Sequence, residues 1–175
     1  MHHSQDYVIL IDQQDNEIGS MEKIQAHQQG KLHRAFSIFI FNSKKELLIQ
    51  KRADNKYHSG GLWSNTCCGH PRPGELTENA AQRRLQEEIG ITCQLHYLFP
   101  FTYFVKFDNN LIENELDHIF TGITDKTPLI NPNEISDFKY MTMAAISNEL
   151  EKTPTSYTVW FKLIFNQLQK TIYQL

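Results

Sequence analysis

Two long extended segments in the second half of the chain constrain its fold most strongly. Leu95–Phe107 and Leu111–Ile123 are rich in aromatic and β-branched residues, and Asp108-Asn109-Asn110 lies between them. Asp and Asn favour turns because their short side chains hydrogen-bond to the nearby backbone and tolerate a left-handed conformation. The pattern therefore predicts a long β-hairpin that turns at these three residues.

A helix is predicted before this hairpin, over Glu75–Ile89. Its apolar residues recur about every 3.6 positions, the helical period; they are Leu76, Ala80, Ala81, Leu85 and Ile89. Thr77 is the predicted N-cap, because its hydroxyl can accept a hydrogen bond from a free backbone N–H. Gly90 stands where a C-cap glycine belongs, since glycine readily adopts the left-handed conformation that ends many helices.

Shorter segments complete a mixed pattern of strands and helices. Strands are predicted at Tyr7–Asp12, Phe36–Phe41, Leu47–Arg52 and Phe138–Met143, and helices at Ala144–Leu150 and Ser156–Ile172. Turn-type residues separate the second and third strands, which favours a hairpin. The order predicts an α+β fold, a mixed β-sheet with flanking helices in an α/β/α sandwich. The length of 175 residues fits a single domain spanning residues 1–175.

Composition and cysteine usage narrow the partners and the compartment. A net charge of -3 at pH 7 gives no broad attraction for nucleic acid or an anionic membrane, so neither partner is expected. No apolar run is long enough to span a bilayer, and no secretory signal is seen. His2 and His3 are given no functional role. The cysteines are odd in number with two adjacent, a poor basis for disulfides, so we expect a cytoplasmic protein.

The segment Thr66–Glu75, TCCGHPRPGE, raises three chemical possibilities. A zinc knuckle is excluded, because Cys67 and Cys68 are adjacent whereas a knuckle needs about two to four residues between its cysteines. Cys68 is then either a small buried apolar residue, the commoner case, or a reactive thiol. Its place beside Gly69 and His70, on a loop before a helix, favours the reactive thiol, with a pKa tuned by the helix N-terminus and a nearby cation.

Glu113 and Glu115 lie two apart on a predicted strand, so their carboxylates leave the sheet on the same face. A solvated strand face is one explanation, and a divalent cation that removes their repulsion is the other. Upstream imidazoles that could join them are His27 and His33, near the loop that enters the strand Phe36–Phe41, and His70. Such an N/O set suits Mn²⁺, Zn²⁺, Fe²⁺ or Mg²⁺, although spacing alone does not bring the five residues together.

Charged residues on the predicted helix also have two readings. Arg83–Glu87 and Arg84–Glu88 have the i,i+4 spacing of ion pairs on a solvated face. A carboxylate of this helix can instead hold the Mg²⁺ that accompanies a diphosphate. Elsewhere, the ordinary expectation for Lys23, Arg52 and Lys56 is a solvated side chain. The ordinary expectation for Tyr103 and Trp160 is a place in the core, although an aromatic face can also stabilise a cation.

The segment Gly69–Ile91, GHPRPGELTENAAQRRLQEEIGI, resembles the Nudix box. The residues at the expected spacing are Gly69, Glu75, Arg83, Leu85, Glu87, Glu88, Gly90 and Ile91. The box has a glutamate directly after Arg83, where this chain has Arg84. In the pyrophosphohydrolases of this family that glutamate helps to build the catalytic Mg²⁺ cluster. The resemblance therefore implies a Nudix fold and argues against Nudix hydrolysis.

More closely still, the chain resembles the type 1 isopentenyl-diphosphate isomerases, which have a Nudix fold but are not hydrolases. The matching segments are His27, LHRAFS (32–37), QKRADNK (50–56), LWSNTCCGHP (62–71), RRLQEEIG (83–90), ENE (113–115) and YTVWF (157–161). They lie in order over nearly the whole chain.

This resemblance implies a role for each candidate residue. The ligands of a divalent metal, Mn²⁺, Zn²⁺ or Mg²⁺, would be His27, His33, His70, Glu113 and Glu115. The catalytic residues would be Cys68, Glu115, Tyr103 and Trp160. Glu88 would bind the Mg²⁺ that arrives with the substrate diphosphate, and the basic residues at the diphosphate would be Lys23, Arg52 and Lys56. Cys67 receives no role.

The implied reaction converts isopentenyl diphosphate, a small-molecule substrate, into dimethylallyl diphosphate. The double bond moves by protonation and deprotonation, with cationic character at C3. Which of Cys68 and Glu115 protonates is open, and so is the metal. The alternatives are a Nudix pyrophosphohydrolase of a nucleoside diphosphate derivative, which Arg84 disfavours, and a non-catalytic module that binds metal or diphosphate. The chain is expected to be a monomer or weak homodimer.

Overall fold

The computed structural model describes residues 7–172, so His2 and His3 lie outside the described part. The strands are β1 Tyr7–Ile11, β2 Glu17–Glu22, β3 His33–Phe41, β4 Glu46–Arg52, β5 Trp63–Ser64, β6 Cys67–Gly69, β7 His96–Lys106, β8 Ile112–Ile123 and β9 Ile135–Thr142. The helices are α1 Lys23–Gln29, α2 Thr77–Ile89, α3 Met143–Lys152 and α4 Val159–Ile172, with a 3₁₀ turn at Pro154–Ser156. No helix among the described residues is long and apolar enough to cross a membrane.

The nine strands within residues 7–172 form one mixed sheet around β3. β3 pairs with β8 in parallel and with β6 antiparallel, and it is buried from Ala35 to Phe41. A near-continuous apolar strand of this kind is typical of a sheet that is covered on both faces. The predicted hairpin is confirmed, because β7 and β8 pair antiparallel and Asn110 in their turn has a φ of 62°.

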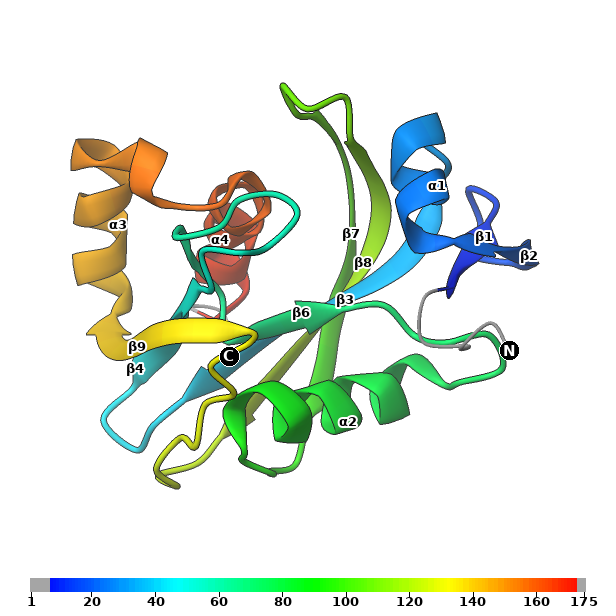
Figure 1. The fold of residues 1–175 in the computed structure, drawn as a ribbon. Helices are drawn as coiled ribbons and strands as arrows, with labels where there is room; N and C mark the ends of the chain where they lie inside the picture. Colours follow the sequence, from blue (N-terminus) through cyan, green and yellow to red (C-terminus); the bar gives the residue numbers. More distant parts are fainter. Residues whose placement is uncertain (1–6, 173–175) are drawn as a thin grey trace.

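Neighbouring residues of β3 point to opposite faces of the sheet and enter two different cores. Ile38 packs on one face in the cluster that contains Leu85 of α2. Phe39 packs on the other face, where its ring stacks 6.3 Å from that of Phe161 in α4. Figure 1 shows α2 on one side of the sheet and α3 and α4 on the other, which confirms the predicted mixed sheet with flanking helices.

The ends of α2 differ in how well the sequence predicted them. Gly90 is the C-cap, as predicted, with a φ of 70° and its N–H donating to Gln86 O. The N-cap prediction was wrong: Leu76 is the N-cap without a side-chain hydrogen bond, and Thr77 is already the first helical residue. Glu75 lies outside the helix, and its carboxylate accepts hydrogen bonds from Arg72 N and from the Arg83 guanidinium.

Three further differences lie around the first strands. β2 and α1 were not predicted. His27 lies on α1 rather than near a loop. This helix begins where the Glu22 carboxylate accepts hydrogen bonds from the N–H groups of Ile24 and Gln25. Cys68 lies on the short strand β6 rather than on a loop. The hairpin of β3 and β4 pairs only next to its turn, at Phe41 and Leu47, and β4 continues alongside β9.

Candidate metal centre and adjoining pocket

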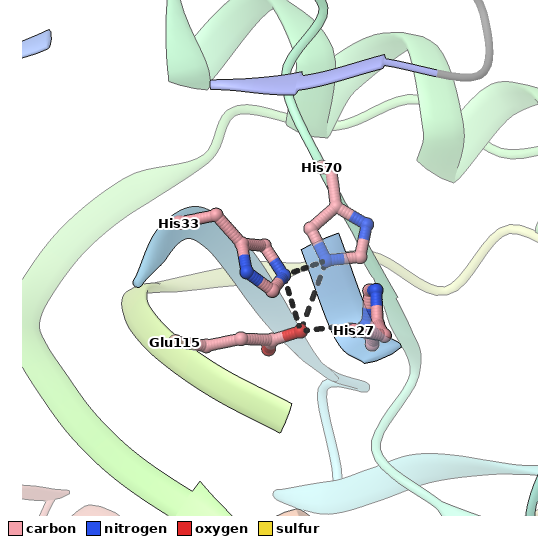
Figure 2. Close-up of side chains that lie close together, drawn as sticks. All are labelled: His27, His33, His70 and Glu115. Carbon is pink, nitrogen blue, oxygen red and sulfur yellow. Dashed lines mark hydrogen bonds and ion pairs between the residues drawn. The ribbon is translucent and has the colours of Figure 1, made fainter. Parts of the chain in front are cut away.

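Three histidines and a glutamate from separate elements meet at one end of the sheet (Figure 2). The distances from Glu115 Oε1 are 2.9 Å to His70 Nε2, 3.2 Å to His33 Nε2 and 3.7 Å to His27 Nε2. Glu115 lies directly opposite His33 because β3 and β8 pair in parallel with that register. α1 contributes His27, and His70 follows directly after β6.

Backbone carbonyls fix the tautomers of two of these rings. His27 Nδ1 lies 2.7 Å from Lys23 O, and His33 Nδ1 lies 2.8 Å from Lys31 O. A carbonyl can only accept, so Nδ1 carries the proton and Nε2 presents its lone pair to the cluster. His27 Nε2 is buried there without a hydrogen-bond partner. Ligating histidines in metal sites are commonly held in this way, so the cluster can hold a divalent metal.

Glu113 lies beside this cluster rather than within it. Glu113, His27 and His58 form an adjoining group. One carboxylate oxygen and one ring nitrogen from each histidine lie within 4.8 Å of one another in this group. Glu113 Oε1 lies 3.2 Å from His58 Nε2. Sequence reasoning missed His58, because a single histidine in a loop between β4 and β5 leaves no periodic signal. The two groups share His27, so all five predicted ligands lie in one continuous buried region.

Burial sets the charge state of this region. Burial and the neighbouring Glu115 charge raise the pKa of the Glu113 carboxyl well above its usual range. Burial opposes ionisation of Glu115 too, but its contacts with the three imidazoles hold its pKa well below the usual range. Burial lowers the pKa of His70 to about 4. An ionised Glu115 beside a neutral His70 matches the protonation states in which these groups bind metals.

A cavity of about 360 Å³ adjoins the cluster. The predicted site residues that line it are Lys23, Arg52, Lys56, Cys68, His70, Glu88, Tyr103, Glu113, Glu115 and Trp160. The fully buried His27 and His33 lie behind this lining. The volume lies in the range of about 300–1,000 Å³ that is typical of small-molecule sites. The structure thus brings residues from almost the whole chain to a single cavity.

The two cysteines of β6 point in opposite directions, as neighbours on a strand must. Cys67 is fully buried and packs in the cluster beneath α2. Cys68 packs on the other face and lines the cavity. Burial raises the pKa of the Cys68 thiol to about 12. The pKa of Cys68 is therefore not set mainly by a helix N-terminus and a cation, as expected from the sequence. The raising effect of burial on this pKa is larger than the lowering effect of the Arg52 charge.

Basic and acidic side chains alternate along another part of the cavity wall. Both predicted helix ion pairs are present, Arg83 with Glu87 at 3.2 Å and Arg84 with Glu88. Arg84 Nη2 also lies 3.2 Å from Glu134 Oε1, and Lys56 pairs with that same glutamate. Sequence reasoning missed Glu134, which lies in the loop before β9.

An aromatic side chain and a buried cation meet in the cavity. The Arg52 guanidinium lies 5.1 Å from the centre of the Trp160 ring, within the range of cation–π attraction. Both residues are buried, so the default expectation of a solvated arginine was wrong. Lys23 likewise lies 5.0 Å from the centre of the Tyr57 ring.

The fold is that of a known class. Residues 31–162 match the family profile described as NUDIX domain. Among solved structures, DR0079 from Deinococcus radiodurans superposes with a TM-score of 0.74 at 18% identity, covering 92% of this chain and 97% of that one. The MutT protein from Methanosarcina mazei Go1 superposes with a TM-score of 0.62 at 20% identity, covering 79% of this chain and 94% of that one. At these identities the solved structures establish the fold alone.

Relatives with much higher identity define the family more narrowly. A protein of Pectobacterium atrosepticum named isopentenyl-diphosphate Delta-isomerase is 51% identical over 161 residues, which cover 92% of this chain and 90% of that protein. A protein of Photorhabdus laumondii named isopentenyl-diphosphate Delta-isomerase 2 is 53% identical, covering 92% and 91%. The chain therefore belongs to the isopentenyl-diphosphate Delta-isomerase family of NUDIX-domain proteins.

Proposed function

We propose that this chain is an isopentenyl-diphosphate Delta-isomerase, which converts isopentenyl diphosphate into dimethylallyl diphosphate. The observation that carries the proposal is the cavity beside the histidine cluster, which both Cys68 and Glu115 line, in a chain 51% identical to a named isomerase. Arg84 occupies the position of a Nudix-box glutamate and is paired with Glu87 and Glu88, an arrangement that disfavours hydrolysis.

The reaction requires one proton to be added and another to be removed. Cys68 and Glu115 are the proposed acid/base pair, since they are proton-transfer groups that line the same cavity. The Tyr103 hydroxyl donates to Glu115 Oε2 at 2.6 Å and so holds that carboxylate in place. Trp160 offers an aromatic face to the cationic C3 centre, and the reaction needs water to be kept away from that centre.

The metal roles follow from the donor sets. The His27, His33, His70 and Glu115 cluster, with Glu113 beside it, would hold Mn²⁺, Zn²⁺ or Mg²⁺. Such a metal would fix the orientation and the charge state of Glu115.

The diphosphate end of the substrate would occupy the charged part of the cavity. Glu88 would hold the Mg²⁺ that the diphosphate brings, and Lys23, Arg52 and Lys56 would take its negative charge. Lys56 is paired with Glu134, so binding would exchange that carboxylate for the diphosphate.

Incubation with isopentenyl diphosphate, Mg²⁺ and Mn²⁺ tests the proposal. Formation of acid-labile dimethylallyl diphosphate is expected, and Cys68→Ala should abolish it. Release of phosphate or a nucleoside monophosphate from a nucleoside diphosphate derivative would instead indicate a hydrolase. Metal binding without turnover of either substrate would indicate a binding module.

A further inference from the structure

His58 is a buried histidine that none of the roles above uses. It lies in the loop between β4 and β5, and its side chain is 4% exposed. Nε2 lies 3.2 Å from Glu113 Oε1 but is not aligned as a hydrogen bond, so this buried nitrogen has no partner. A buried polar nitrogen without a partner costs free energy. A small rotation of the Glu113 carboxylate would supply one.

Aromatic neighbours fix the plane of the His58 ring. Phe107 stacks on it with ring centres 4.7 Å apart at an angle of 17°. Tyr57 contacts it edge-on at 4.3 Å, and Trp160 lies edge-on at 5.7 Å. The direction of Nε2 is therefore set by packing on three sides, and a carboxylate that bonds to it would be held in one orientation.

A hydroxyl lies beside the other ring nitrogen of His58. Ser59 Oγ lies 3.3 Å from His58 Nδ1. This hydroxyl can donate to Nδ1 or accept from it, and the tautomer in which it donates carries the ring proton on Nε2. In that tautomer Nε2 faces Glu113 Oε1 as a donor. The other oxygen of that carboxylate, Oε2, lies 3.3 Å from the Tyr103 hydroxyl oxygen, so the two oxygens have separate neighbours.

We propose that His58 is a positioning residue for Glu113, donating its Nε2–H to Oε1 and thereby orienting this carboxylate toward the metal held by the histidine cluster. The inference rests on the proposed metal site. In this tautomer His58 acts through Glu113 and is not itself a ligand, because the ring proton occupies the nitrogen that faces Glu113. Partners that orient ligating side chains in this way are typically worth about 10–100-fold in metal affinity.

Two substitutions of His58 separate positioning from packing. His58→Phe keeps the ring and its stacking on Phe107 but removes the donor. His58→Gln loses the ring but places an amide N–H close to the position of Nε2. The matched control is His96→Phe, at an exposed histidine of β7. The measurement is the dissociation constant for Mn²⁺ of the full chain, from the electron paramagnetic resonance signal of the free ion, with circular dichroism to verify folding.

We expect His58→Phe to weaken Mn²⁺ binding by roughly 10–100-fold, with His58→Gln weakened only a few-fold and His96→Phe unchanged. In the Glu113→Gln background His58→Phe should cause no further loss of Mn²⁺ affinity. If His58→Phe does not fold, His58→Leu takes its place. Wild-type affinity in His58→Phe would overturn the inference while leaving the metal site intact. Equal losses in the Gln and Phe variants would also overturn it. Absence of Mn²⁺ binding by the wild-type chain would overturn the metal site itself and this inference with it.

Discussion

Tyr103 lies directly opposite Glu115 in the pairing of β7 with β8, and its hydroxyl donates to Glu115 Oε2 at 2.6 Å. The same carboxylate presents Oε1 to the histidine cluster. The two pairings of β8, with β7 and with β3, thus place a partner at each oxygen of the residue that joins the metal centre to the cavity.

Tyr103→Phe should therefore lower kcat with little change in KM, because it frees Glu115 without altering the diphosphate contacts. The expected loss is about 10–100-fold, as for other partners that orient a ligating carboxylate. Tyr97→Phe, at a half-exposed tyrosine of the same strand, is the matched control for steady-state kinetics. Equal kcat values for both variants would rule out the positioning role of Tyr103.

The adjacent cysteines should respond to substitution in opposite ways. Cys68→Ala should abolish turnover and leave the free energy of unfolding nearly unchanged, since Cys68 lines the cavity. Cys67→Ala should retain turnover and lower stability by about 1 kcal/mol, because it leaves a small void beneath α2. Turnover assays and urea unfolding of both variants check this. Substantial activity in Cys68→Ala would remove that residue from the acid/base pair.

Gly90 should be far less replaceable than Gly74. Both have positive φ, 70° and 78° respectively, so alanine is strained at either position. A Cβ on Gly90 would also lie 2.6 Å from the Leu129 backbone oxygen, whereas one on Gly74 would meet nothing within 4 Å. We expect Gly90→Ala to cost roughly 1–3 kcal/mol more than Gly74→Ala in urea unfolding. Equal losses would show that the Leu129 contact is not limiting.

The Glu75–Arg83 pair should contribute a pH-dependent part of stability. Hydrogen bonds from Arg83 lower the pKa of the Glu75 carboxyl below its ordinary value of 4.5. A carboxyl with a lowered folded-state pKa stabilises the fold above its unfolded-state pKa, and this contribution is lost as pH falls through the folded-state value. The stability gap between the wild type and Glu75→Gln should thus be full near pH 6 and shrink below about pH 4.5.

Chemical denaturation across this pH range measures the gap. The same substitution in an Arg83→Gln background serves as the control, and there the pH dependence of the gap should largely disappear. A gap that stays constant down to pH 3 in the wild-type background would contradict the assignment.

The sequence was informative where a pattern is local. The alternating strand positions placed Glu113 and Glu115 on one face, and Gly90 marked a helix end, because both follow from the period of a single element. The meeting of His33 with Glu115 was not predictable in this way. It depends on the parallel register of β3 and β8, which is set by packing between segments far apart in the chain.

Two omissions have physical causes of the same kind. The helix α1 is short and mostly polar, KIQAHQQ, and it is capped by the Glu22 carboxylate rather than by a common N-cap residue. Its helical signal is therefore weak in sequence. His58 lies in an irregular loop, and its place beside Glu113 depends on the packing of Tyr57, Phe107 and Trp160 around its ring.

The central claim is tested most directly by following isopentenyl diphosphate with the metal-loaded protein in D₂O by NMR. Protonation of the terminal carbon by a solvent-exchanged group should give dimethylallyl diphosphate with deuterium in a methyl group, and neither Cys68→Ala nor Glu115→Gln should form it. Unchanged substrate with the metal-loaded wild-type protein, or product that forms equally well in both variants, would contradict the account.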